Sequence, residues 1–216
     1  ILTFSPIIII TRIFLGKEDQ YRFKEKFGFC SKNNNIKDTV WIHGASVGEI
    51  LSIVPVIRKF EEDKKIRKIL ITSSTTSSSY IFSKFKFKKT IHQFYPYDLN
   101  FITKHFINHW KPKVAIFVDS EVWPNMFNNL HKKKIPLILL NARITNKSFK
   151  KWKYFPEFSK NIFNKITMAL PQNTETKKYL KSLGAKNIKF LGNIKFFGNT
   201  NKKKKENTNL KRQFSN

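Results

Sequence analysis

Short apolar runs alternate with longer helical patterns along this chain, and this alternation constrains the fold more than any other feature. From Thr39 onward most runs are rich in Ile, Val, Leu or Phe without polar alternation, which is typical of parallel strands covered on both faces. The predicted strands are residues 40–43, 69–72, 90–94, 114–118, 137–140, 166–169 and 188–191. Helical patterns occupy residues 47–60, 78–85, 101–110, 123–132, 148–164 and 174–183. The sequence therefore predicts an α/β fold with a doubly wound, mainly parallel sheet.

The charge of the chain is strongly positive, with 42 Lys and Arg against 14 Asp and Glu, a formal net charge of +28. One interpretation is a polyanionic partner such as nucleic acid, anionic lipid or a phosphorylated substrate. The other is codon bias, because Lys, Asn, Ile and Phe are all over-used and all have A/T-rich codons. The single cysteine, Cys30, excludes an internal disulfide and any zinc site built on several cysteines.

The two ends of the chain differ in composition from its middle. Residues 1–15 are almost entirely apolar, and basic residues follow, which suits an anionic membrane surface. A buried N-terminal helix is the alternative, and the apolar run alone is too short to span a bilayer. After Phe197 the chain is rich in Lys and Asn, which predicts disorder. We expect a membrane-associating segment, one domain and a lysine-rich tail, over residues 1–19, 20–197 and 198–216 respectively.

Sites in such sheets lie at the carboxyl ends of strands, beside helix N-termini. The first such loop ends in Ser46, Gly48 and Glu49. These residues match a capping box, in which Ser46 is the N-cap and Glu49 reaches back to it, and this segment alone favours that interpretation. They also fit a functional site, since Gly48 would let a ligand approach and the helix N-terminus would keep Glu49 ionised. An ionised carboxylate near a hydroxyl group serves as a general base.

Three further loops carry polar residues at predicted strand ends. Residues 73–79 are seven consecutive Ser or Thr residues, which suit either an anion site or a polar helix cap. Asp119 and Glu121 leave another strand just before a helix, where the helix dipole alone would favour acids. Arg143 follows a further strand and fits either a fork for a carboxylate or phosphate or a salt bridge to one of those acids.

Several kinds of site lack support in the sequence. There is no G-x-G-x-x-G and no Walker lysine loop, so dinucleotide and P-loop sites are not supported. His105 and His109 lie at i, i+4 without the glutamate of the zincin pattern. His43 is interpreted as a packed residue at a strand end. We expect no metal and no cofactor.

Seven segments, taken in chain order, carry a more specific signal. They read WIHGASVGE, ITSSTTSSS, YPYD, WKPKVAIFVDSEVWPN, IPLILLNARIT, LPQNTET and LGAKNIKFLGNIKF. Together they resemble the 3-deoxy-D-manno-octulosonic acid (Kdo) transferases of lipopolysaccharide assembly, with only the second segment matching loosely. The resemblance extends from residue 20 to Phe196, and SVGE, E-x-WPN, NAR and GNIKF in this order are its most specific parts.

This resemblance implies a Rossmann-like N-terminal half of a two-domain glycosyltransferase B fold. In that family the N-terminal domain receives the lipid A precursor and the C-terminal domain holds CMP-Kdo. The implied enzyme works at the cytoplasmic face of the bacterial inner membrane. It transfers Kdo to a hydroxyl group of the acceptor with inversion, and no metal is expected.

The resemblance also assigns site residues by position. Glu49 matches the family's proton acceptor, Asp119 falls where the family usually has Glu, and Lys195 matches a lysine assigned to charge stabilisation in the transition state. The other candidates are expected to bind substrate, and they are Ser46, Gly48, Glu121, Asn125, Asn141 and Arg143.

Two departures from the family pattern limit these expectations. Asp119 is one methylene shorter than Glu, so a direct contact there would be lost or bridged by water. The match ends at GNIKF, so we expect an acceptor-side half that is inactive alone. The alternative is a non-catalytic basic module that binds lipid A precursor or nucleic acid, although the carboxylates at strand ends make nucleic acid an unexpected partner.

Overall fold

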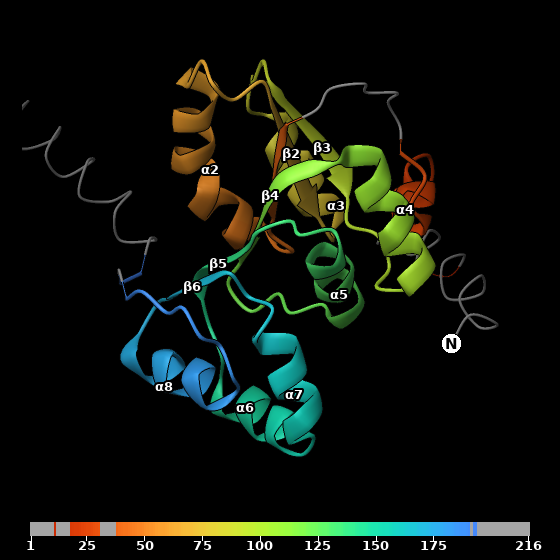
Figure 1. Ribbon diagram of the computed structural model, residues 1–216. Coiled ribbons are helices and arrows are strands. Elements are labelled where there is room, and N and C mark those ends of the chain that lie inside the picture. Colours follow the sequence, from red (N-terminus) through yellow and green to blue (C-terminus); the bar gives the residue numbers. More distant parts are fainter. Residues whose placement is uncertain (1–10, 12–17, 31–37, 191, 194–216) are drawn as a thin grey trace, which may run out of the picture.

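A six-stranded parallel sheet forms the centre of the protein in the computed structural model, which describes residues 11, 18–30, 38–190, 192 and 193 (Figure 1). All of its neighbouring strands pair in parallel, and their spatial order is β3-β2-β1-β4-β5-β6. The strands are β1 (Thr39–His43), β2 (Lys68–Ser73), β3 (Thr90–Phe94), β4 (Pro112–Val118), β5 (Leu137–Ala142) and β6 (Met168–Pro171). The predicted doubly wound α/β fold is therefore confirmed.

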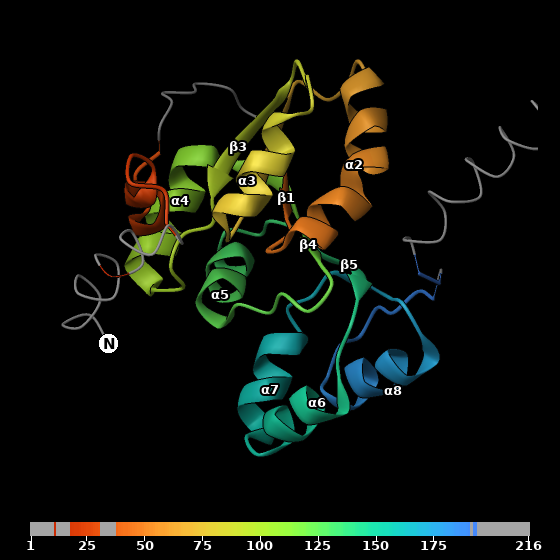
Figure 2. The ribbon, with the colours of Figure 1, turned by 180° about the vertical axis from the view of Figure 1, so that it is seen from behind.

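Two apolar cores cover the two faces of the sheet, as Figures 1 and 2 show from opposite sides. One face packs against α2 (Val47–Glu62) and α3 (Thr76–Ser83) through an isoleucine-rich cluster. The opposite face packs against α4 (Asn100–Trp110), α5 (Pro124–Lys132) and α7 (Pro156–Phe163) through a cluster rich in aromatic residues. Strands buried on both faces explain the apolar runs without polar alternation.

The strand order reverses direction between β1 and β4, which pair directly. Along the sequence, 68 residues separate the end of β1 at His43 from the start of β4 at Pro112. Such a reversal is the topological switch point at which open α/β sheets bind ligands, outside the carboxyl ends of the strands. The loops that follow β1 and β4 therefore flank the place where a ligand is expected. The loop after β1 leads directly into the first turn of α2, which carries Glu49, and the loop after β4 carries Glu121.

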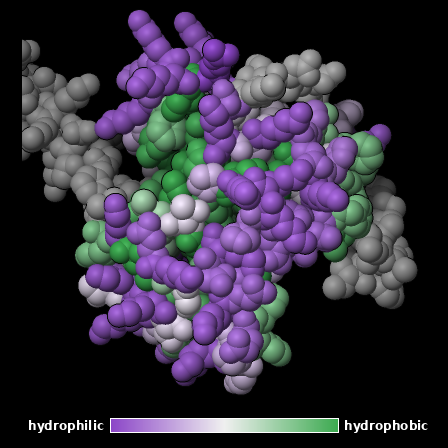
Figure 3. Space-filling view, viewed as in Figure 1, coloured by the Kyte–Doolittle hydropathy of each residue, from purple (hydrophilic) through white to green (hydrophobic). Residues whose placement is uncertain are grey.

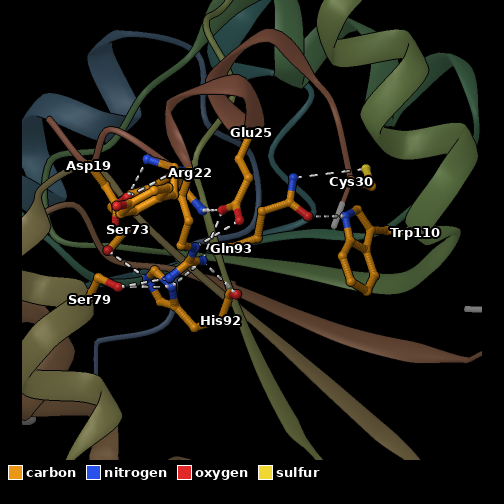
Figure 4. A network of polar contacts seen from close by, with 11 residues as sticks. Asp19, Arg22, Glu25, Cys30, Ser73, Ser79, His92, Gln93 and Trp110 are labelled. Carbon is orange, nitrogen blue, oxygen red and sulfur yellow. Dashed lines mark hydrogen bonds and ion pairs between the residues drawn. The ribbon is translucent and has the colours of Figure 1, made fainter. Parts of the chain in front are cut away.

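A short 3-10 helix, η1 (Phe23–Phe27), packs against β3 and was not predicted from the sequence. The Glu25 carboxylate accepts hydrogen bonds from the Phe94 backbone N–H at 2.7 Å and from the Arg22 guanidinium at 2.8 and 2.9 Å. Arg22 also donates to the His92 carbonyl, and these side chains point toward one another in Figure 4. Burial and the Arg22 charge lower the pKa of His92 to about 3, so this histidine is neutral.

Two of the predicted elements are wrong. The single helix expected over residues 148–164 is broken into α6 (Asn146–Lys153) and α7, because Pro156 has no N–H to donate and its ring would clash with the carbonyl four residues earlier. The strand expected over residues 188–191 is a single bridge between Ile188 and Ala169 within the described residues. The helix α8 (Thr174–Ser182) agrees with its prediction.

Some predictions fall on residues outside the described part of the chain. These include Lys195, nearly all of the expected membrane-associating segment and the whole lysine-rich tail. Within the described part, no helix combines the length and the apolar character needed to cross a bilayer. Hydrophilic side chains dominate the face drawn in Figure 3, in keeping with the high lysine content.

Candidate active site

The loop after β1 holds Glu49 through contacts within a single turn of the chain. Ser46 is the N-cap of α2, and its hydroxyl lies 3.4 Å from the Glu49 N–H. The Ser46 hydroxyl also donates to one carboxylate oxygen of Glu49 at 2.9 Å, and the Ala45 N–H donates to the other at 2.7 Å. The capping interpretation is thus confirmed in a modified form, because Glu49 reaches the backbone N–H of Ala45 rather than that of Ser46.

The electrostatic surroundings of Glu49 raise its pKa. Burial raises the pKa of Glu49, and the hydrogen bonds from Ala45 and Ser46 lower it. The charges of Glu121 and Asp119 raise the pKa again, so that it lies above the usual glutamate value. This direction runs against the expected effect of the helix N-terminus, because burial and neighbouring acids outweigh it. A raised pKa makes Glu49 a stronger base once it has lost its proton.

The segment after β4 holds Glu121 through one local contact, from Trp123, and one contact from another strand, from His43. One carboxylate oxygen accepts from Trp123 Nε1 at 2.8 Å and lies 3.2 Å from His43 Nε2. Burial raises the pKa of Glu121, but the hydrogen bond and charge of His43 and the Trp123 hydrogen bond outweigh it, so the pKa is lowered overall. Glu121 is therefore an ionised acceptor beside Glu49.

His43 links Glu121 to the core of the domain. Because an ionised carboxylate only accepts, His43 Nε2 carries a proton toward Glu121. The other ring nitrogen lies 3.0 Å from the Thr72 hydroxyl, which itself accepts from Trp41 Nε1 at 2.9 Å. His43 is fully buried, which confirms its interpretation as a packed strand-end residue. The sequence did not indicate that this packed residue also holds a candidate site carboxylate.

Tyr95 completes the aromatic packing around His43. Its ring stacks on the His43 ring with centroids 4.0 Å apart, and its centroid lies 5.2 Å from the centroid of the Trp123 ring. Its buried hydroxyl has no hydrogen-bond partner among the described residues. Burial and the charges of Asp98 and Glu121 raise the pKa of Tyr95 well above its usual value, so the phenol stays neutral.

Asp119 directly follows β4 and Asn141 is the last but one residue of β5, and both adopt the left-handed region of backbone conformation, with φ of 62° and 54°. Asp and Asn adopt this region more readily than most residues, which gives a physical reason for a short acid at position 119. Both side chains are nearly buried, at 7% and 1% exposure. The Arg143 N–H donates to the Asp119 carbonyl at 3.0 Å, so the ends of β4 and β5 are tied together.

Arg143 presents an exposed side chain beside these buried residues. Its guanidinium forms no ion pair or hydrogen bond with the described part of the chain. The salt bridge to a neighbouring carboxylate, one of the two alternatives drawn from the sequence, is therefore not present among these residues. An exposed guanidinium beside the strand ends remains available to a carboxylate or phosphate.

Asn125 has a structural partner in Asp98, which comes from the YPYD segment. The Asp98 carboxylate accepts from the backbone N–H groups of Asn125 at 3.0 Å and of Met126 at 2.8 Å, so it caps the N-terminus of α5. The Asn125 side chain donates to the Asp98 carbonyl at 2.6 Å. Trp123, at the N-cap position of α5, makes no side-chain capping bond of its own.

The two glycines of the first loop face different surroundings. A Cβ placed on Gly44 would lie 3.2 Å from the Glu49 Cβ, so Gly44 allows α2 to begin close to the end of β1. A Cβ placed on Gly48 would meet nothing within 4 Å. Gly48 is exposed and helical, so open space lies in front of it beside Glu49.

The hydroxyl-rich stretch after β2 is largely used within the fold. Thr75 caps α3 through the Ser78 N–H, and the Ser78 hydroxyl donates to the Ala45 carbonyl at 3.3 Å. The Ser73 and Ser79 hydroxyls both contact the His92 ring. These contacts favour the polar-cap interpretation over an anion site.

The structure brings Glu49, Asp119 and Glu121 to one edge of the sheet and adds His43, Tyr95 and Asp98 to the predicted set. The YPYD segment was the one signal in the sequence for Tyr95 and Asp98. No cluster of His, Cys, Asp and Glu among the described residues could hold a metal ion.

Solved structures with the same fold define the class of this domain. A UDP-GlcNAc 2-epimerase from Neisseria meningitidis, solved with bound UDP-GlcNAc, superposes with a TM-score of 0.53. The matched region is 73% of this chain and 47% of the epimerase chain. The two sequences are 14% identical there, so the match shows the fold alone. The domain is a Rossmann-like α/β domain of the kind found in glycosyltransferase B folds.

A family profile identifies the relatives more closely. The profile described as 3-Deoxy-D-manno-octulosonic-acid transferase (kdotransferase) matches residues 21–197, and the chain belongs to this family. A 3-deoxy-D-manno-octulosonic acid transferase of Rickettsia bellii is 36% identical over 190 residues, 88% of this chain and 45% of that protein. The enzyme of that name from Haemophilus influenzae is 28% identical over 210 residues, 93% of this chain and 48% of that protein. The chain thus spans about half the length of the curated relatives it matches.

Proposed function

We propose that this chain is the acceptor-side part of a glycosyltransferase that moves Kdo from CMP-Kdo to a hydroxyl group of the lipid A precursor. The observation that carries the proposal is the position of Glu49. Its carboxylate lies at the switch point, open space lies in front of Gly48, and its raised pKa suits a base.

In the proposed reaction Glu49 removes the proton from the acceptor hydroxyl as that oxygen attacks the anomeric carbon of Kdo. The new C–O bond forms while the bond to CMP breaks, so CMP leaves with the bonding electrons. Attack from the face opposite the leaving group inverts the anomeric centre. The rate depends on holding the acceptor oxygen within bonding reach of the donor, which is a positioning task for the protein.

Other residues have narrower proposed roles. The exposed Arg143 guanidinium would bind a phosphate or carboxylate of a substrate in a fork. Ser46 and Ala45 hold the Glu49 carboxylate by hydrogen bonds that a bound acceptor would have to share or replace. Asp119, Glu121, Asn125 and Asn141 would line the acceptor side, and Lys195 would stabilise charge as the family resemblance implies.

The proposed acceptor also sets the proposed location and partners. A lipid-linked acceptor lies in a membrane, so we place the protein at the cytoplasmic face of the bacterial inner membrane, on an anionic surface. CMP-Kdo would be bound by a C-terminal domain, as the family resemblance implies, and transfer by this acceptor-side part would require that domain.

Incubation of the purified chain with CMP-Kdo and lipid A precursor tests the requirement for the donor half. We expect no transfer from the chain alone and transfer when the C-terminal half of a relative is supplied. Transfer by the chain alone would show that a separate donor domain is unnecessary. Failure of the combined halves to transfer would count against the proposed reaction itself.

The net charge of +28 supports one other candidate, a non-catalytic module that binds lipid A precursor or nucleic acid. Binding of nucleic acid through lysines would weaken steeply as salt is raised. Tight, salt-sensitive binding of RNA or DNA without affinity for the lipid A precursor would favour this candidate over the enzyme.

A further inference from the structure

The corner between α6 and α7 exposes three aromatic side chains within five residues of the sequence. Tyr154, Phe155 and Phe158 are 78%, 68% and 48% exposed. Single exposed apolar residues are normal on protein surfaces, but several large rings at one corner mark a contact surface. The helix α6 that leads into this corner has no buried residue at all.

Lysines surround these rings. Residues 147–160 contain five exposed lysines and one acid, Glu157, a local net charge of +4 (5 − 1). Figure 3 shows hydrophobic and hydrophilic residues mixed at the lower end of the molecule, where Figure 1 places α6 and α7. We call this surface the aromatic-basic corner, and it consists of Tyr154, Phe155, Phe158, Lys147, Lys150, Lys151, Lys153 and Lys160.

The fold holds the aromatic-basic corner in a fixed shape. The buried Ser159 hydroxyl donates to the Trp152 carbonyl at 2.5 Å, and the Phe155 N–H donates to the same carbonyl at 3.2 Å. The Trp152 ring packs edge-on against Phe163 of the core, with ring centroids 5.2 Å apart, and stacks on Phe158, with ring centroids 6.2 Å apart. These contacts fix the backbone that carries the exposed rings. Binding through the rings therefore requires little further loss of backbone conformational entropy.

We propose that the aromatic-basic corner is a docking surface for an anionic lipid bilayer. Aromatic rings enter the interfacial region of a bilayer, and lysines around them pair with anionic headgroups while their stems cover apolar surface. The excess of lysines complements the negative surface charge of such a bilayer. The inference rests on the proposed lipid-linked acceptor for its biological sense, but its physical basis is independent of the reaction.

The position of the corner fits a lipid-linked acceptor. The helix α6 begins three residues after Arg143 and has eight residues. Eight helical residues span about 12 Å, so the backbone at the corner lies about that far from the start of α6, the end nearer Arg143 in the sequence. Docking at the corner would therefore hold the end of α6 that follows Arg143 near the bilayer surface.

Vesicle flotation with the full chain tests the proposal. The wild-type protein should float with phosphatidylglycerol-containing vesicles and much less with phosphatidylcholine vesicles, and raising salt should weaken the binding. The double variant Tyr154→Ser, Phe155→Ser should lower the partition coefficient at least about tenfold. The matched control Tyr21→Ser, Tyr80→Ser removes two aromatics of similar exposure, 81% and 64%, and should change it less than about twofold.

A contact readout separates docking from an indirect effect on stability. The indole fluorescence of a Phe155→Trp variant should shift to the blue and be quenched by brominated lipids when vesicles are added, because the ring enters the interface. A Tyr80→Trp variant is the control and should show neither change. Equal responses from the two variants, or equal flotation of the two double variants, would overturn the proposal.

Other outcomes also decide the question. Absence of wild-type binding to anionic vesicles, or equal binding to neutral ones, would overturn the proposal. So would a concentration-dependent dimer lost in the Tyr154→Ser, Phe155→Ser variant without any vesicle binding, which would assign the surface to a second copy. Binding as expected, without transfer after the donor half is supplied, would reject the proposed reaction and leave the docking surface intact.

Discussion

The two loops that flank the switch point hold their glutamates in different ways. Glu49 is fixed by Ala45 and Ser46, its neighbours within four residues, whereas Glu121 is fixed both by Trp123, two residues away, and by His43, 78 residues away on another strand. The pKa of Glu49 is raised, chiefly by burial, while the partners of Glu121 outweigh burial and lower its pKa. One edge of the sheet thus presents a base and a stable anion side by side, which suits two carboxylates with separate tasks.

The largest expected effect is the loss of the base. In the chain supplied with a donor half, Glu49→Gln should reduce transfer by about 10²–10⁴-fold, because the amide accepts no proton. Stability should change little, since Gln also completes a capping box. Initial rates with CMP-Kdo and lipid A precursor measure the first effect, and urea unfolding measures the second.

The matched control is Glu121→Gln, which removes the anion and keeps the side-chain shape. If Glu121 is a supporting acceptor, this variant should lose less activity than Glu49→Gln. A Glu49→Gln enzyme that transfers near the wild-type rate would leave Glu49 with its capping role alone.

The next effect tests how strongly the distant contact holds its loop. His43→Leu should lower the free energy of unfolding by about 3 kcal/mol, because it leaves the largely buried Glu121 carboxylate without its ring partner. Ser46→Ala, which breaks the local arrangement around Glu49, should cost about 1 kcal/mol. Urea denaturation of both variants gives the comparison, and equal losses would contradict the distinction between the two loops.

The paired glycines give a smaller and opposite pair of effects. Gly48→Ala should raise stability by up to about 1 kcal/mol, since alanine favours the helix and its Cβ meets open space. The same variant should weaken acceptor binding if the acceptor occupies that space. Gly44→Ala should instead be destabilising, because its Cβ would press on Glu49. Thermal unfolding and acceptor titration of both variants measure these effects.

The smallest expected effect is on the pH dependence of stability. The lowered pKa of Glu121 contributes stability that is present above its unfolded pKa and is lost as pH falls through the folded value. The raised pKa of Glu49 contributes stability that is present below its unfolded pKa and is lost as pH rises through the folded value.

Stability profiles between about pH 3 and pH 7 should therefore differ in opposite directions for the two Gln variants. Relative to wild type, Glu121→Gln should lose stability toward the upper end of that range, and Glu49→Gln should gain it there. Differences of the same sign in both variants would show that the two carboxylates share one environment.

Most of the fold was predictable because its signals are local. Six predicted apolar runs correspond to the six strands of the sheet. Parallel strands covered on both faces are continuously apolar, so they are easy to recognise in a sequence. The prediction failed where one residue overrode a pattern, as Pro156 does in dividing α6 from α7. It also missed η1, whose position depends on Glu25 meeting the backbone of β3.

For the candidate site, the sequence by itself determined the Glu49 loop, because Ala45, Ser46 and Glu49 lie within one turn and their hydrogen bonds need no other part of the chain. Only the tertiary structure decided that His43 joins the local Trp123 as a partner of Glu121. The β1–β4 register pairs His43 with Phe117, and this pairing brings the loop four residues later beside the histidine ring. The capping arrangement around Glu49 thus depends on a short segment alone. The contact between His43 and Glu121 exists only after the sheet has assembled.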